Sequence, residues 1–272
     1  MGVLNVTPDS FFDGGRYADR QRALNHAHRM LDDGAAIIDI GGESTRPGAK
    51  PTAEAEELDR VLPLFKALRA DCDARGVPLS VDTRKPAVMR AAIAAGASMV
   101  NDIDALRADG ALDAVAKSGV AVCLMHMQGE PLTMQKNAAY EDDVVAVVAA
   151  FLSERAQACE QAGIAHGHIA IDPGFGFGKT LAHNLELLRR LPEIVALGYP
   201  VVAGLSRKST IGTLTGRPVE ERGAGSLAAA LAAVARGASL LRVHDVRETV
   251  DALNVWQAME TGQRPGSAGG RG

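Results

Sequence analysis

Polar and charged side chains stand at the ends of short apolar runs along this whole chain. In chain order they are Asn5; Glu43, Ser44, Thr45 and Arg46; Asp82; Asn101 and Asp102; His126; Asp172; Ser206, Arg207 and Lys208; and Arg242 and His244. If the apolar runs are parallel strands, their carboxyl ends share one face, which is where α/β enzymes assemble their active sites. The pattern therefore predicts a polar rim.

The residue types on this rim suit two kinds of ligand group. Asp82, Asn101 and Asp172 supply acceptors and a mixed amide, which match a ring edge that presents an amino group beside an N–H. A cationic set is suited to phosphate or carboxylate oxygens, and it consists of Arg46, Lys208, Arg242 and His244. Together they indicate a site for a heterocycle that carries an anion.

A single polar residue after a strand is often only a helix N-cap, and Thr83 and Asp102 could each have that role. Polar groups after every apolar run are harder to explain by capping alone. We therefore interpret the set as functional.

Several other patterns give only weak evidence for a functional site. The segment from Gly174 to Thr180 resembles a phosphate-binding P-loop but is one residue short, and Pro173 stands where its first glycine should be. The closely spaced histidines have no acidic or cysteine neighbours at metal-site spacing, which favours surface or hydrogen-bonded roles for His26, His28, His166 and His168. No GxSxG nucleophile elbow occurs in the sequence.

Eight apolar, β-branched runs predict the strands that position this rim: Gly2 to Asn5, Ala36 to Ile40, Pro78 to Val81, Ser98 to Val100, Val120 to Leu124, His168 to Ile171, Val201 to Ala203 and Ser239 to Val243. Helical periodicity fills the intervals, as at 19–33, 53–75, 85–95, 140–162 and 219–236. Strand and helix alternating eight times predict an α/β fold of the (β/α)8 TIM-barrel type, with a doubly wound open sheet as the alternative.

The barrel is expected to span residues 1–261 as a single domain, followed by a low-complexity, disordered tail at 262–272. The longest loops between a strand and the next helix, at 6–18 and 41–52, are rich in glycine, proline and polar residues. Such loops commonly belong to active sites.

Composition limits the classes of partner. The chain has 272 residues, 47% hydrophobic and 23% charged, with a net charge of −4. This balance gives no basic surplus for nucleic acid or anionic membranes. The three separated cysteines predict reduced thiols, and no apolar stretch is long enough to span a bilayer. We therefore expect a cytoplasmic protein.

Eight segments in order resemble the bacterial dihydropteroate synthase family of pterin-binding enzymes, over nearly the whole chain. They are MGVLNVTPDSF at 1–11, DIGGESTRPG at 39–48, SVDT at 80–83, NDI at 101–103, LMHMQG at 124–129, DPGFGFGK at 172–179, SRKS at 206–209 and RVHD at 242–245. The resemblance implies a barrel, usually dimeric. Its members condense (7,8-dihydropterin-6-yl)methyl diphosphate with 4-aminobenzoate to give 7,8-dihydropteroate and diphosphate, and sulfonamides compete with 4-aminobenzoate.

The resemblance also implies roles for individual residues. Asp82, Asn101, Asp172 and Lys208 would hold the pterin, with Ile103 and Met125 lining its pocket. Asn5 would ligate Mg²⁺ on the diphosphate, which Thr45, Arg242 and His244 would bind. The 4-aminobenzoate site would be shaped by Phe11, Thr45, Arg46, Pro47, Phe177, Ser206 and Lys208. The catalytic set implied is Asp82, Lys208, Arg242 and His244.

Two departures from the family pattern stand out. The chain begins at its first barrel strand, so the family's usual N-terminal extension is apparently missing, and Phe12 stands where a smaller residue is common. Two rival functions remain. One is a barrel that presents methyltetrahydrofolate to a corrinoid protein, which needs no diphosphate site, and the other is a catalytically silent pterin-binding scaffold.

Overall fold

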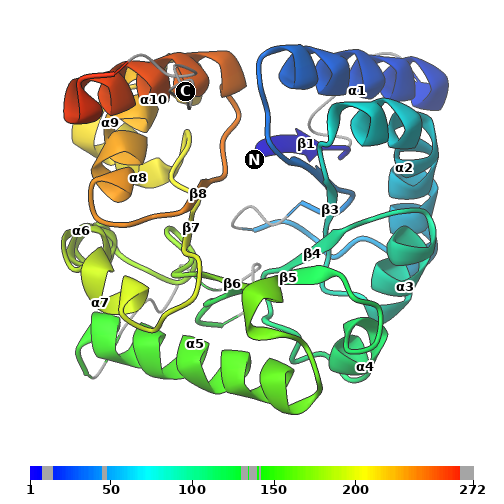
Figure 1. The fold of residues 1–272 in the computed structure, drawn as a ribbon, viewed down its shortest axis with the longest axis horizontal. Coiled ribbons are helices and arrows are strands. Elements are labelled where there is room, and N and C mark those ends of the chain that lie inside the picture. Colours follow the sequence, from blue (N-terminus) through cyan, green and yellow to red (C-terminus); the bar gives the residue numbers. More distant parts are fainter. Residues whose placement is uncertain (8–14, 45–47, 130–133, 135–139, 141, 264–272) are drawn as a thin grey trace, which may run out of the picture.

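Parallel strands form the wall of a barrel, and helices surround that wall (Figure 1). The computed structural model describes residues 1–7, 15–44, 48–129, 134, 140 and 142–263, without the side chains of residues 15–18. Within these residues the strands are β1 Gly2–Asn5, β2 Ile38–Gly41, β3 Leu79–Asp82, β4 Met99–Asp102, β5 Ala121–Met125, β6 Ile169–Asp172, β7 Val202–Ala203 and β8 Leu240–Leu241.

The barrel closes through narrow contacts between two sheets. In the described part of the chain β1 to β6 pair in sequence order as one sheet, and β7 pairs with β8 as another. Isolated parallel bridges join Ile171 to Val201 and Gly2 to Val243. At the second seam Val3 N donates to Val243 O at 3.0 Å. The predicted (β/α)8 fold is confirmed, and the open-sheet alternative is wrong.

The helices surround this wall in chain order. They are α1 Gly15–Asp32, α2 Glu54–Arg75, α3 Pro86–Ala94, α4 Ala111–Val115, α5 Val144–Gln161, α6 Leu181–Arg189, α7 Leu191–Val195, α8 Ser209–Thr215, α9 Gly223–Val234 and α10 Val246–Thr261, with 3₁₀ turns at His166–His168 and Val219–Glu221.

Two predicted helix starts were wrong. The helix expected from residue 140 begins at Val144, because the Asp143 side chain caps α5 by accepting from Val145 N at 3.1 Å. The helix expected from residue 219 is interrupted, and α9 begins only at Gly223. Arg222, between the 3₁₀ turn and α9, has φ −85° and ψ 7°, which is outside the α-helical region and separates the two elements.

The strands are apolar on both faces because each face is buried in a different layer. Side chains such as Leu4, Ile40 and Val81 are fully buried in the layer that packs against the helices. The inward face of the lower barrel is filled by a second cluster of Met99, Cys123, Ala170 and Val202. Above that cluster the inward positions become polar, and these positions form the candidate site.

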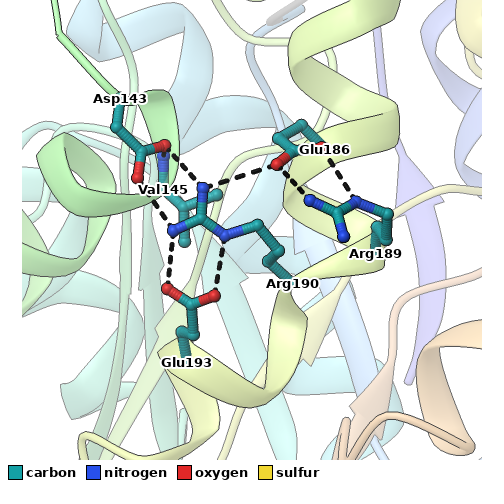
Figure 2. Close-up of polar contacts among 6 residues, drawn as sticks. All are labelled: Asp143, Val145, Glu186, Arg189, Arg190 and Glu193. Carbon is teal, nitrogen blue, oxygen red and sulfur yellow. Dashed lines mark hydrogen bonds and ion pairs between the residues drawn. The ribbon is translucent and has the colours of Figure 1, made fainter.

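An ion-pair network fastens α5 to the α6–α7 junction (Figure 2). Arg190 contacts the Asp143 carboxylate at 2.8 Å and Glu193 at 2.7 Å. Glu186 links it to the neighbouring Arg189. Because these groups are partly or largely solvent-exposed, the network contributes little to the stability of the fold.

Candidate active site

The strand register brings four positions into one row at the carboxyl end of the barrel. Asn5 pairs with Gly41, Gly41 with Asp82, and Asp82 with Asn101. Residues in register share the inward face. A Cβ at Gly41 would lie 3.5 Å from both Asn5 Oδ1 and Asp82 Oδ2. Both oxygens therefore lie over the glycine, in the space that a side chain at position 41 would fill.

Arg242 connects this row to the opposite side of the barrel. Its Nε donates to Asp39 Oδ2 at 2.7 Å, and its Nη2 donates to Asp82 Oδ2 at 2.7 Å. Asp39 Oδ2 also accepts from Asn101 Nδ2 at 3.0 Å. Two carboxylates, one guanidinium and one amide thus form a single cluster, which is buried except for part of the Arg242 side chain.

Asp172 stands at the end of β6 and is buried. Its Oδ1 accepts from Gly174 N at 2.7 Å. Gly174 has a φ of +69°, and a Cβ there would lie 1.9 Å from His126 O, so the turn requires glycine. The tight turn folds the chain back at the barrel mouth and leaves the carboxylate inside it.

Lys208 follows β7 and faces Asp172 across Gly204. A Cβ at Gly204 would lie 3.6 Å from Lys208 Nζ and 3.8 Å from Asp172 Oδ2. Lys208 Nζ also donates to Phe175 O at 2.5 Å and lies 4.7 Å from the centroid of the Phe177 ring. The ammonium therefore has a carbonyl, a π face and a nearby carboxylate as partners.

A separate apolar cluster stands beside these polar groups. It consists of Ile103, Met125, Met127 and Met134, with Phe177 packed against it. Met125 is the register partner of Asp172. Methionines adapt to flat ligand surfaces, and here they adjoin acceptors suited to a ring edge.

Ser206 and His244 form a further pair, because Ser206 Oγ lies 3.1 Å from His244 Nδ1. Burial, followed by the positive charge of Arg242, lowers the pKa of His244 to about 4. The imidazole is therefore neutral at pH 7. This differs from the expectation that His244 is one of the cations of the rim, because burial disfavours the charged ring.

Burial also shifts the acidic and basic groups toward neutral pH. It raises the pKa of Asp82 to about 7, although Arg242 opposes the shift. It raises the pKa of Asp172 as well, against the charge of Lys208. The pKa of Lys208 falls to about 8, again chiefly through burial. Perturbed groups gathered in one place are typical of functional sites.

The segment that resembles a P-loop contains Lys179, whose contacts are structural. Lys179 is buried, and its Nζ lies 3.0 Å from Gly174 O, 3.0 Å from Phe177 O and 2.9 Å from His126 Nδ1. Burial lowers the pKa of His126 to about 3, so the ring is a neutral acceptor. Lys179 holds the glycine-rich loop from within.

Other residues of the polar rim make structural contacts and do not join the site residues at the mouth of the barrel. Asp102 accepts from the backbone N–H groups of Asp104 and Leu106, as the capping interpretation allowed. Glu43 forms an ion pair with Lys85, and Arg207 forms one with Asp245. The capping role allowed for Asp102 thus agrees with its backbone contacts, and Glu43 and Arg207 each have a side-chain partner of opposite charge.

Of the site residues predicted, Asn5, Asp82, Asn101, Ile103, Met125, Asp172, Phe177, Ser206, Lys208, Arg242 and His244 are described, and the contacts above link them into one region. Phe11, Thr45, Arg46 and Pro47 lie outside the described residues. Sequence reasoning missed Asp39 as part of the cluster. The available signal was a carboxylate in the middle of an apolar strand.

Two general properties of the described residues complete the picture. They contain no group of three or more His, Cys, Asp or Glu side chains arranged to hold a metal ion. Among the helices described, none combines the length and apolar character needed to cross a bilayer.

Known proteins resemble this chain over nearly its whole length. The family described as pterin binding enzyme matches residues 1–244. The dihydropteroate synthase of Haemophilus influenzae is 51% identical, and the match covers 95% of this chain and 92% of that protein. Xanthomonas albilineans dihydropteroate synthase with 4-aminobenzoic acid has a TM-score of 0.89 and 56% identity, covering 96% of this chain and 92% of that one. For the Yersinia pestis enzyme with a sulfonamide drug, the values are 0.90 and 50%, with coverage of 96% and 94%.

Proposed function

The chain belongs to the family of pterin-binding enzymes, and we infer that it is a dihydropteroate synthase. It condenses (7,8-dihydropterin-6-yl)methyl diphosphate with 4-aminobenzoate, and it releases diphosphate and 7,8-dihydropteroate. The observation that carries this function is the juxtaposition of buried Asp82, Asn101 and Asp172 with Lys208 beside a methionine-lined wall. This is the combination that a heterocycle with paired N–H donors needs.

We propose that the pterin ring lies between the apolar wall and the buried acceptors. Ile103 and Met125 would contact its faces, while Asp172 and Asn101 would accept from its amino and N–H groups. Asp82 would offset positive charge that develops in the ring. Lys208 would donate to a ring acceptor, in place of or beside its bond to Phe175 O.

The diphosphate would lie at the mouth near Arg242, His244 and Thr45. Arg242 is a planar donor with several N–H groups, so it can meet more than one oxygen. His244 is neutral and would act as a hydrogen-bond donor rather than as a charge.

A magnesium ion fits the chemistry of this mouth. Mg²⁺ binds oxygen ligands, usually one or two from the protein together with phosphate oxygens and water. The amide oxygen of Asn5, which lies over Gly41, is the protein ligand that we propose. When bound, the ion would neutralise charge on the diphosphate.

The second substrate would be held next to Lys208. Ser206, Lys208 and the Phe177 ring would form one wall of the 4-aminobenzoate site. Phe11, Thr45, Arg46 and Pro47 would complete it. The same site would accept sulfonamides as competitors.

The reaction breaks the bond between the methylene carbon and the diphosphate oxygen and forms a carbon–nitrogen bond to the aromatic amine. The electron-rich ring can stabilise positive charge at that carbon, so departure of diphosphate can precede attack. Arg242 stabilises the negative charge that leaves, while Asp82 and Asp172 face the positive charge that develops. An aromatic amine is largely unprotonated at neutral pH, so it needs no strong base.

We also propose a homodimer in the cytoplasm. Val255 and Met259 lie one turn apart on α10 and are exposed, so they give this helix a small apolar contact for a second copy. Replacing Met259 with Glu should shift the sedimentation of a dimer toward that of a monomer. The three cysteines are free and buried, which agrees with a reducing compartment.

The decisive experiment is an assay with purified protein, both substrates and Mg²⁺. We expect equal amounts of 7,8-dihydropteroate and diphosphate, inhibited by a sulfonamide. Omitting 4-aminobenzoate is the control for unproductive hydrolysis. Methyl transfer from methyltetrahydrofolate to a corrinoid acceptor, without diphosphate release, would favour the rival function. Pterin binding without turnover would indicate a silent scaffold.

A further inference from the structure

Asp39 is a carboxylate inside the barrel, beneath the candidate site. It lies in the middle of β2 with no exposed surface. Its Oδ2 accepts from Asn101 Nδ2 of β4 and from Arg242 Nε after β8. Both partners are residues to which we assign substrate contacts, whereas Asp39 itself is below the mouth.

The bond to Asn101 fixes which way that amide faces. Because Asn101 Nδ2 donates to Asp39, the amide oxygen is the atom left to accept from a ligand. The opposite orientation would place the amide oxygen against a carboxylate oxygen. Asp39 thereby makes Asn101 an acceptor toward the mouth, as an N–H donor on a heterocycle requires.

The bond to Arg242 fixes the guanidinium. Asp39 holds Nε and Asp82 holds Nη2, so two carboxylates set the plane of the group. A guanidinium oriented in advance loses less freedom when it meets an anion. Without Asp39, the hydrogen bond to Asp82 would be the one that Arg242 keeps among the residues that the structure describes.

A stabilising role alone explains this arrangement poorly. Burying an ion pair costs solvation that its attraction often fails to recover. Among the described residues, Asp39 Oδ1 has no hydrogen-bond partner, so the carboxylate is not satisfied as a structural group usually is.

We propose that Asp39 is a positioning residue for the condensation, which acts through Asn101 and Arg242 and does not touch substrate. The proposal rests on the function assigned above to those two residues. Asp39 sets the acceptor orientation of the amide and the plane of the guanidinium at the same time.

Two variants separate its two effects. In Asp39→Asn the new amide oxygen can still accept from Asn101, but the negative charge beside Arg242 is lost. We expect KM for the pterin substrate to stay within about 3-fold and kcat to fall about 10-fold or more. Asp39→Ser removes both bonds, so KM should rise as well as kcat fall.

Ser80→Ala is the matched control. Ser80 is the register partner of Asp39, is fully buried, and its Oγ has no hydrogen-bond partner among the described residues. Its loss alters the barrel interior equally deeply but leaves Asn101 and Arg242 untouched. Both kinetic constants should remain at the parent values.

Thermal unfolding is measured on every variant, and kinetics are normalised to folded protein. If folded Asp39→Asn keeps the parent kcat, or if Ser80→Ala loses as much turnover, the positioning role is wrong. If Asp39→Ser does not fold, Asp39→Asn alone decides. A parent protein that releases no diphosphate would instead overturn the proposed function, so the two failures are distinguishable.

Discussion

At the scale of single residues, Asp172 provides a direct test of the pterin site. Its carboxylate is buried at the end of β6 and faces Lys208. We expect Asp172→Ala to weaken pterin binding about 30-fold or more in a folded barrel, because losing a buried charged acceptor costs about 2–4 kcal/mol. Asp172→Asn, which keeps an acceptor for Gly174 N, should lose less. Calorimetry measures both, and unchanged affinity in a folded alanine variant would remove Asp172 from the site.

Arg242→Lys should impair turnover severely although it preserves charge. Lysine cannot reach Asp39 and Asp82 with two separate nitrogens and still present a flat donor to the diphosphate. Loss of one preorganised donor to a leaving anion typically costs about 10²-fold in kcat. Arg217→Lys, in an exposed surface pair, is the control. Turnover close to that of the parent would show that the two-carboxylate cradle has no catalytic role.

The pH dependence of kcat/KM should be bell-shaped. The pKa of Asp82 is about 7, so acid removes an acceptor, and the pKa of Lys208 is about 8, so alkali removes a cation. Both limbs of the kcat/KM profile report pKa values of groups in the free enzyme. Lys208→Arg should shift the alkaline limb far upward, because arginine stays charged. A flat profile across both values would contradict these assignments.

At the scale of elements, the sequence predicts the strands of the barrel wall well. It predicts poorly the side-chain contacts between elements that are far apart in the chain. The predicted bounds of all eight strands lie within about two residues of those in the structure, because the pattern of apolar residues in each strand and helix is a local signal. The Asp39 bonds join residues 62 and 203 positions apart, so no local pattern reveals them. The neutrality of His244 depends likewise on burial that only the folded barrel creates.

The loop after β6 can be tested as an element through Lys179, because this side chain holds the loop in place. Lys179→Met would leave the carbonyls of Gly174, Phe177 and His126 without this donor. Each unsatisfied buried acceptor costs about 1–3 kcal/mol, so we expect a loss of about 3 kcal/mol or more in unfolding free energy. Lys117→Met, at an exposed lysine, should change it by less than about 0.5 kcal/mol. Equal stability of the two variants in denaturant unfolding would show that Lys179 is dispensable.

At the scale of the whole molecule, stability should rise between about pH 7 and pH 9. Burial lowers the pKa of Lys179 to about 7 and that of Lys208 to about 8, below the unfolded value of 10.5. The unfolded chain therefore binds more protons over most of this window, once Asp82 and Asp102, whose pKa values burial raises to about 7, are ionised in both states. Raising the pH then favours the folded state. The expected slope is on the order of 1 kcal/mol per pH unit.

Above pH 9 the cysteines begin to oppose this trend, since burial raises the pKa of Cys159 to about 11. Chemical denaturation at fixed pH values measures the slope, and Lys179→Met should reduce it. Stability that falls from pH 7 to 9 would be the opposite of this expectation. Maximum stability and maximum activity should thus occur at different pH values.

The division of the barrel into a sheet of six strands and a sheet of two also divides its chemistry. Asn5, Asp82, Asn101 and Asp172 belong to the larger sheet, while Ser206, Lys208, Arg242 and His244 lie on or beside the smaller one. A backbone cut in the β6–β7 connection, near Gly198, would leave these acceptors on one fragment and Lys208 and Arg242 on the other. Neither fragment could catalyse the condensation alone, so recovered turnover would report their reassociation. The same seam offers a place to split this barrel into a complementation pair whose opposite charges favour reunion.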